Sequence, residues 1–117
     1  MGKSKENNQN YLGEFEEIVL LAILRLDAEA YGVTIRREIE NETHRTASVG
    51  AVYTTLERLE KKGYISSRQG EATAERGGRA KRYFQIEGAG AEALEQAMAA
   101  RKRLLKGVKL KRLRHRV

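Results

Sequence analysis

The chain has 117 residues, no cysteine, no tryptophan and a net charge of +7 at neutral pH. This length is typical of one domain, and the absence of cysteine excludes disulfide bonds and thiolate metal sites. The longest apolar run, residues 18–24, is far shorter than the roughly 20 residues that a transmembrane helix needs, and the polar residues 1–10 do not form a secretory signal. We therefore expect a soluble, cytoplasmic protein without a membrane partner.

The first helix is predicted after a polar arm, residues 1–10, that we expect to be disordered. Apolar residues then recur at intervals of three and four, which predicts a helix from residue 12 or 13 to residue 26. Its inward side chains are expected to be Phe15, Ile18, Val19, Ala22, Ile23 and Leu26. Leu20, Leu21 and Leu24 widen this apolar surface, which indicates a helix covered by the core and by a partner.

Two more helices are predicted, from residue 32 or 33 to 42 and from 48 to 62. The side chains expected to face the core are Ile35 and Ile39 in the second helix and Val49, Val52, Leu56 and Leu59 in the third. Ser48 can cap the third helix, and Gly63 is placed to end it in the left-handed conformation. The other face of this helix begins with small or hydroxyl-bearing residues, so it can approach another molecule closely.

After the third helix the pattern changes from helix to strand. Two strands are predicted over residues 64–69 and 81–86, with Phe84 and Ile86 on one face. Residues 70–78, between the strands, contain three glycines and no large apolar residue. We expect this segment to be an extended hairpin loop.

A last helix is predicted from about residue 90. Its apolar spacing suits packing against a partner helix, although Arg101 interrupts the stripe and Gly107 either ends or kinks the helix. The residues of the stripe are Ala91, Leu94, Met98, Arg101, Leu105 and Val108. We expect a first domain over residues 11–87, a C-terminal dimerisation helix over 88–108 and a basic tail over 109–117.

Three helices followed by a two-stranded hairpin is the element order of a winged helix-turn-helix, a mainly α (α+β) fold with a β-wing. We therefore expect residues 11–87 to be a DNA-binding domain, in which the third helix enters the major groove and its N-terminal residues face the bases. The candidates for these contacts are Ser48, Gly50, Ala51, Tyr53 and Thr54, with Arg58 one turn later. None of the first five is a bidentate reader of a base, so base specificity is expected to be modest or assisted by DNA shape.

The hairpin carries a second group of candidates for DNA contact. These are Arg76, Arg79, Lys81 and Arg82, which lie among glycines that let the backbone come close to phosphates. Arginine can also enter a narrow minor groove, where the potential is most negative. The alternative for Arg82 is an ordinary strand residue paired with a surface carboxylate.

The C-terminal end holds most of the excess charge. Residues 101–116 contain nine Lys or Arg and no Asp or Glu, whereas residues 1–100 have a net charge of −2. A charge run is often only a solvated surface. The other two interpretations are an extension of the DNA footprint, with contacts to phosphates alone, and an amphipathic segment that lies on an acidic surface.

Three stretches of the sequence resemble the PadR family of bacterial transcriptional regulators. They are YGVTI (residues 31–35), GAVYTTLERLEKKGYI (50–65) and GGRAKRYFQI (77–86). The resemblance covers roughly residues 11–105 and is to the smaller type, with a single C-terminal helix. It implies a homodimeric repressor in the cytoplasm, associated with the nucleoid when bound to a palindromic operator on double-stranded DNA.

The resemblance also implies how the dimer forms, with the C-terminal helix packed on the first helix of the partner. The interface residues that we carry over are Phe15, Val19, Leu94, Met98 and Leu105. Three positions depart from the family pattern. Thr54 and Ala80 stand where proline is common, and Glu87 stands where a threonine commonly caps the last helix. None of these departures removes a donor to DNA.

Four aromatic residues could have roles other than, or in addition to, contact with DNA. Tyr53 is either a phosphate contact or a ring that packs on the second helix, and both roles are compatible. Tyr31 is expected in the core. Tyr11 and Phe15 could line a crevice for a small aromatic effector that relieves DNA binding.

Other functions have weaker support. His44 and His115 are the only histidines and lie far apart in the sequence, so no catalytic set and no structural zinc site can be assembled. We expect no enzyme, no cofactor and no metal. The remaining alternative is a winged helix that serves as a protein-interaction module, with the third helix docked on a protein partner.

Overall fold

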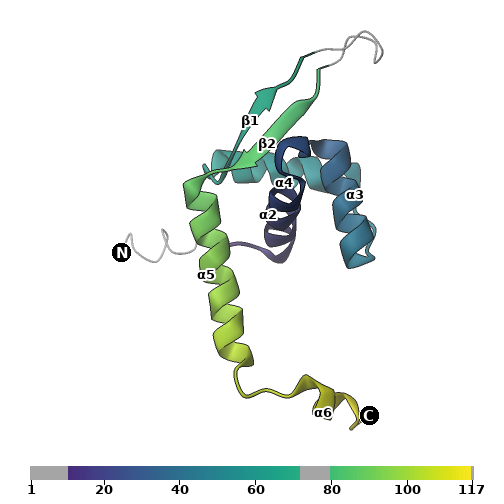
Figure 1. Cartoon of the computed structure of the whole chain (residues 1–117), viewed down its shortest axis with the longest axis vertical. Helices are drawn as coiled ribbons and strands as arrows, with labels where there is room; N and C mark the ends of the chain where they lie inside the picture. Colours follow the sequence, from purple (N-terminus) through teal and green to yellow (C-terminus); the bar gives the residue numbers. More distant parts are fainter. Residues whose placement is uncertain (1–10, 72–79, 117) are drawn as a thin grey trace.

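The structure is a computed structural model that describes residues 11–71 and 80–116. Its elements, in chain order, are α2 (Glu14–Leu26), the short 3-10 helix η1 (Asp27–Glu29), α3 (Gly32–Thr43), α4 (Val49–Lys61), β1 (Ile65–Gln69), β2 (Arg82–Ile86), α5 (Gly88–Leu105) and α6 (Leu110–Arg114). Three helices precede an antiparallel hairpin and a long helix (Figure 1), which confirms the predicted fold class. Within the described ranges, no helix is both long and apolar enough to cross a membrane.

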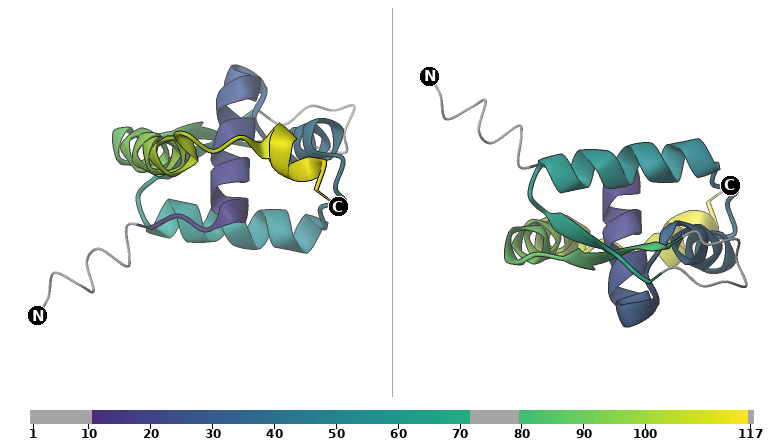
Figure 2. Two further views of the ribbon diagram at one scale, coloured as in Figure 1. Left: turned by 90° about the horizontal axis from the view of Figure 1, so that it is seen from below. Right: turned by 90° about the horizontal axis from the view of Figure 1, so that it is seen from above.

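α2 forms the centre of the domain. It runs across α4, with α3 and α5 on opposite sides of it (Figure 2), and it buries Val19, Leu20 and Ile23. The other large side chains of the core are Ile35, Ile39, Val52, Leu56, Leu59, Tyr64, Ile65, Phe84 and Leu94. Because one fully buried aliphatic side chain stabilises the fold by about 1.5–3 kcal/mol, this single cluster can hold the helices and the hairpin together.

α4 begins and ends where the sequence predicts. The Ser48 hydroxyl accepts a hydrogen bond from the backbone N–H of Ala51 at 3.0 Å, and Gly63 has the left-handed φ of 79°. The buried stripe differs from the prediction at its start, since Val49 is 52% exposed whereas Thr55 is buried. Val49 is the first residue of the helix and lies on the outer side, so the predicted core role of Val49 is wrong.

The hairpin is joined to the start of α3 as well as to the core. β1 pairs with β2 along its whole length, and Phe84 of β2 is buried. Tyr31 forms an isolated antiparallel bridge with Tyr83, and the backbone N–H of Phe84 donates to the carbonyl of Ala30 at 2.8 Å. These bonds fix the N-terminus of α3 to β2, so the base of the hairpin has a defined position relative to α3.

Two buried carboxylates at the start of α2 tie neighbouring helices to it. Glu16 accepts from the Lys62 ammonium at 2.9 Å, and Glu17 pairs with Arg101 of α5 at 2.7 Å. The side chains of both glutamates are less than a tenth exposed. A buried carboxylate needs a charged partner, which explains why Arg101 interrupts the apolar stripe of α5.

α5 approaches the hairpin through a close backbone contact. A Cβ on Gly90 would lie 2.2 Å from the Tyr64 carbonyl oxygen, so only glycine leaves room for this crossing. Glu87, at the N-terminal end of the helix, makes no side-chain cap. Its carboxylate instead accepts from the Ser66 hydroxyl at 2.5 Å, and its backbone N–H donates to the Tyr64 carbonyl.

α5 is shorter than the predicted C-terminal helix. It ends at Leu105, and Gly107, with φ of 82°, separates it from the short α6. A left-handed glycine commonly ends a helix. Of the two alternatives for Gly107, the structure therefore shows a helix end, and Val108 lies outside α5.

Candidate nucleic-acid interface

The side of α4 that faces away from the core exposes every α4 candidate. Ser48, Gly50, Ala51, Tyr53, Thr54 and Arg58 are all exposed. A Cβ on Gly50 would meet no atom within 4 Å, so this turn of the helix presents open backbone. The Ser48 oxygen accepts a capping bond, but the hydroxyl hydrogen is still available as a donor. This surface carries small and polar side chains near the start of α4, so it can approach the edges of base pairs closely.

The Tyr53 ring packs on the second helix, α3, as one of its two predicted roles requires, and its hydroxyl is still available for the other role, a phosphate contact. Its ring lies over the first residue of α3, since a Cβ on Gly32 would stand 2.1 Å from the Tyr53 hydroxyl oxygen and 2.5 Å from the ring carbon that carries it. The side chain is still 49% exposed. The hydroxyl is therefore held at the N-terminus of α3, where backbone N–H groups favour anions.

Lys81 is held at the same place by an aromatic ring. Its ammonium lies 4.2 Å from the centroid of the Tyr31 ring and donates to the Tyr31 hydroxyl at 3.2 Å. Tyr31 in turn packs edge-on against Tyr83, with 5.4 Å between ring centroids. Tyr31 is half-buried, so its predicted place in the core is only partly correct. The ring instead positions a cation beside the start of α3.

A groove of about 510 Å³ connects these groups. It runs between α3, α4 and the base of the hairpin. Its lining residues are Tyr31, Gly32, Val33, Tyr53, Ala80, Lys81 and Arg82. Two cations, two phenol hydroxyls and the N-terminus of α3 thus share one surface. Such a set matches the chemistry of a phosphate group better than that of an apolar or cationic ligand.

Arg82 is a strand residue that lies beside a surface carboxylate, which is the alternative to DNA contact that the sequence left open. Its guanidinium lies 4.0 Å from a carboxylate oxygen of Glu60, and the same carboxylate accepts from the Ser67 hydroxyl at 2.7 Å. The Arg82 side chain is 59% exposed. An exposed pair at this distance is weak, so Arg82 can exchange its partner for a phosphate. The other two wing candidates, Arg76 and Arg79, lie outside the described residues.

Two of the five predicted dimer residues belong to the core of the protomer. Val19 is 0% exposed and Leu94 is 4% exposed, and both pack inside the cluster around α2, so neither side chain is free for a second copy. Phe15 is half-buried against the same cluster. Met98 and Leu105 are 50% and 51% exposed and keep the surface that a partner would need.

Part of the wide apolar face that the sequence predicts for the first helix is exposed on α2. Leu21 and Leu24 are 39% and 46% exposed, and they add to the apolar residues of α5 that lie in solvent. The unusual width of the α2 apolar face was the signal for them. The sequence prediction did miss Gly32 and Val33, which line the groove. The only indication of them was that Tyr31 and Gly32 come together at the start of a predicted helix.

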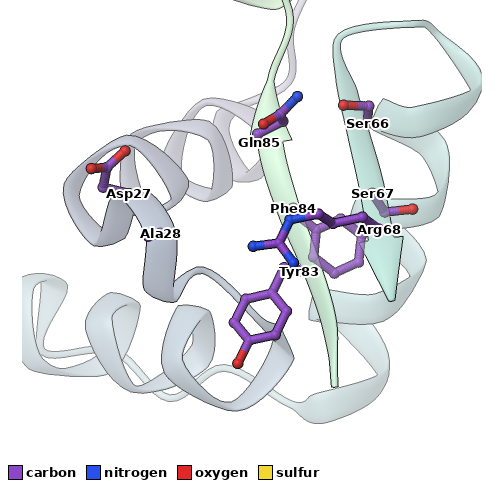
Figure 3. Close-up of a pocket in the computed structure, with 8 residues that line it drawn as sticks. All are labelled: Asp27, Ala28, Ser66, Ser67, Arg68, Tyr83, Phe84 and Gln85. Carbon is purple, nitrogen blue, oxygen red and sulfur yellow. The ribbon is translucent and has the colours of Figure 1, made fainter. Parts of the chain in front are cut away.

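A cleft of about 260 Å³ lies on the other face of the hairpin. Figure 3 shows Arg68 and Tyr83 on the hairpin side and Asp27 on the opposite wall, in η1. The Arg68 guanidinium carbon is 4.9 Å from the centroid of the Tyr83 ring. Asp27 has a φ of 51°, which is rare for a residue other than glycine. The cleft does not include Tyr11 or Phe15, the residues expected to line an effector crevice.

Possible metal ligands do not cluster in the described part of the chain. Over residues 11–71 and 80–116, no three His, Cys, Asp or Glu side chains come together as possible metal ligands.

Comparison with known proteins identifies similar chains. The model of the PadR-like family of transcriptional regulators matches residues 20–96. A transcriptional regulator from Clostridium thermocellum is 28% identical, with 80% of this chain and 89% of that chain covered and a TM-score of 0.62. No match was found among curated proteins.

Two further solved structures share the fold. A PadR-like transcription factor from Bacteroides fragilis is 24% identical, covers 92% of this chain and 96% of its own, and has a TM-score of 0.67. A PadR family transcription regulator from Clostridium difficile is 23% identical, covers 79% and 95% of the two chains, and has a TM-score of 0.57.

Proposed function

The chain belongs to the PadR-like family of transcriptional regulators, and we propose that it is a homodimeric repressor that binds a palindromic operator. The observation that carries this proposal is the groove beside α4, where Tyr53, Lys81 and the N-terminus of α3 converge next to an open, polar helix face. Members of the family are regulators and DNA-binding proteins, not enzymes.

In the proposed complex α4 lies in the major groove. Gly50, Ala51 and Thr54 face base edges, where a hydroxyl can donate or accept and a methyl group can pack on thymine. Tyr53 and Lys81 contact the phosphates beside that groove and fix the position of the helix. Most of the binding free energy then comes from phosphates, and α4 supplies discrimination between sequences.

We propose that dimerisation uses apolar surface on α2 and α5. Five large apolar residues on these helices remain exposed after the core is formed: Leu21 and Leu24 of α2, and Met98, Leu104 and Leu105 of α5. One winged helix alone buries little DNA surface, and a two-fold dimer binds two half-sites at once. Met98→Glu would place a charge in this interface and is expected to give a monomer with reduced operator affinity in sedimentation and binding assays.

Selection of bound duplexes from a random pool tests the operator proposal. We expect an inverted repeat with half-sites about one helical turn apart, because a two-fold dimer reads the same sequence twice. A selected site without internal symmetry would contradict the dimer. The matched pair Lys81→Ala and Lys61→Ala tests the groove. Both substitutions remove one lysine charge, but Lys61 lies at the far end of α4, so only Lys81→Ala should weaken binding several-fold.

A protein-interaction module is the competing function. It predicts that affinity for random duplex DNA is low and nearly independent of salt. The DNA-binding proposal predicts instead a log–log salt dependence with a slope of about −0.9 for each phosphate contacted. A flat titration would therefore favour the protein partner.

We further propose that an effector, if it is a small aromatic compound, binds in the cleft between η1 and the hairpin. Tyr83 offers a ring there, and it lies in β2 only two residues after Lys81, at the base of the wing. Binding in this cleft could therefore change the position of a DNA-contacting cation. A compound that raises the melting temperature and releases DNA from the wild type, but not from Arg68→Gln or Tyr83→Leu, would support this site.

A further inference from the structure

The C-terminal basic segment, residues 102–116, holds positive charge that no carboxylate of the described residues neutralises. It contains eight Lys or Arg and no acidic residue, and all eight side chains are exposed. In the described part of the chain, none of the eight lies within 4.0 Å of a carboxylate. Elsewhere in the chain several cations are paired: Arg25, Arg36, Arg45, Lys62, Arg82 and Arg101.

The basic segment lies far from the groove beside α4. α5 extends away from the hairpin, so the wing and the basic segment occupy opposite ends of the longest dimension of the molecule, which is 57 Å (Figure 1). α5 itself is anchored to α2 by the ion pair between Glu17 and Arg101. Within one protomer, phosphates bound beside α4 are therefore not the ones that the basic segment can reach.

We infer that the basic segment is a second DNA-binding surface, which contacts the phosphate backbone of duplex DNA outside the half-site contacted by α4. Eight lysine and arginine side chains without a neighbouring carboxylate attract a polyanion and release its counterions. Lys102 and Arg103 lie in the last turn of α5, and the other six cations lie beyond the end of α5, in or near α6, which has only five residues. Most of the charge is therefore not carried by an element long enough to hold it against base edges. The surface therefore adds affinity without sequence preference. This inference is independent of which residues of α4 read the operator.

Charge and composition favour DNA over the other possible occupants. A second copy of the segment would bring like charges together, so self-association of residues 102–116 is opposed by repulsion. A membrane surface is a poorer match. Helices that lie in a lipid interface bury a broad, continuous apolar face that often includes aromatic residues. Residues 88–117 contain no Phe, Tyr or Trp, and Gly107 divides the exposed apolar residues of the segment between the end of α5 and the short α6.

The test compares two full-length variants, one that removes four charges and one that keeps them. One replaces Lys109, Lys111, Arg112 and Arg114 with glutamine, and the other exchanges lysine and arginine at the same positions. Fluorescence anisotropy with a random duplex of about 30 base pairs, long enough for two half-sites and their flanks, gives the salt slope for each. We expect the glutamine variant to lower the slope by up to about 3.6 per protomer and the charge-conserving variant to keep it.

Preference for the selected operator separates this inference from the proposed function. The glutamine variant should lose affinity for operator and random DNA by the same factor, so that the ratio is unchanged. Thr54→Ala should lower the ratio and leave the slope intact. If Thr54→Ala had no effect while the glutamine variant behaved as expected, the proposed role of α4 would be wrong and the second surface would stand.

Three results would overturn the inference. The first is an unchanged salt slope in the glutamine variant. The second is a loss of dimer mass by sedimentation in that variant, which would assign the segment to dimerisation. The third is binding of the wild type to phosphatidylglycerol vesicles more tightly than to random duplex at equal salt, with loss of that binding in the glutamine variant, which would assign a membrane instead.

Discussion

Replacement of Gly90 by alanine tests how α5 is seated on the rest of the domain. The new Cβ would stand 2.2 Å from the carbonyl oxygen of Tyr64 and 3.0 Å from its carbonyl carbon, whereas ordinary contacts are 3.4–4 Å. The obstacle is backbone, so α5 has to move away by about 1 Å or more. Such a shift loosens Ala93 and Leu94, which are 9% and 4% exposed. Strain and lost burial together predict a destabilisation of about 2–4 kcal/mol.

Gly88→Ala in the same helix is the control for this substitution. A Cβ on Gly88 meets no atom within 4 Å. Alanine is favoured over glycine in helices by up to about 1 kcal/mol, so Gly88→Ala should be neutral or slightly stabilising. Urea denaturation measures both free energies of unfolding. For a domain of this size, 2–4 kcal/mol corresponds to a fall in melting temperature of roughly 10–20 °C. Equal stability of the two variants would refute the close crossing of α5 over Tyr64.

Three further predictions concern α3, α4 and Tyr64, which precedes β1. Gly32→Ala should displace the Tyr53 side chain, because the new Cβ would stand 2.1 Å from the hydroxyl oxygen. Operator affinity should then fall severalfold while the free energy of unfolding changes by less than about 1 kcal/mol, and a loss of stability without a loss of affinity would contradict this role. Ser48→Ala should cost about 1 kcal/mol in urea denaturation and Ser48→Gly only a few tenths, so equal losses would argue against the cap. Burial, and to a lesser degree the Glu16 carboxylate, raises the pKa of Tyr64 above its usual value of 10.0. The unfolded chain therefore loses the phenol proton of Tyr64 at a lower pH than the folded chain does. The free energy of unfolding should be retained below pH 10 and fall above it, and Tyr64→Phe should remove the part of this fall that is due to Tyr64.

The parts of the fold that sequence reasoning identified correctly are those with local signals. Ser48 caps α4 and Gly63 ends it, and both positions depend only on neighbouring backbone groups. The change from three-four spacing to alternation likewise marks the boundary between α4 and the hairpin. The exposed face of α4 followed from the same periodicity, since the side opposite the buried stripe has to face outward.

The errors arose where an apolar residue had two possible partners. Val19 and Leu94 fit a helical stripe equally well whether the stripe meets the core of the same protomer or a second copy, and only the three-dimensional arrangement shows that both are buried within the protomer. Val49 fits the stripe by spacing but lies on the outer side of the first turn. Periodicity gives the direction of a side chain and leaves its partner undetermined.

Local sequence patterns could not predict the buried charges either. Glu16 and Glu17 read as ordinary acidic residues of a first helical turn, yet both are buried and paired with cations far along the chain. The groove beside α4 depends in the same way on long-range contacts. Lys81 is placed by Tyr31, which lies 50 positions away in the sequence.

The central claim is that DNA binds to the outer face of α4 and the groove beside it. Titration of the isotope-labelled protein with the selected operator duplex, followed by backbone amide NMR, tests this claim directly. The account predicts that the largest shift changes occur at Gly50, Ala51, Thr54 and Lys81, with smaller, salt-sensitive changes in residues 102–116. Changes confined to the C-terminal segment, with α4 unaffected, would contradict it.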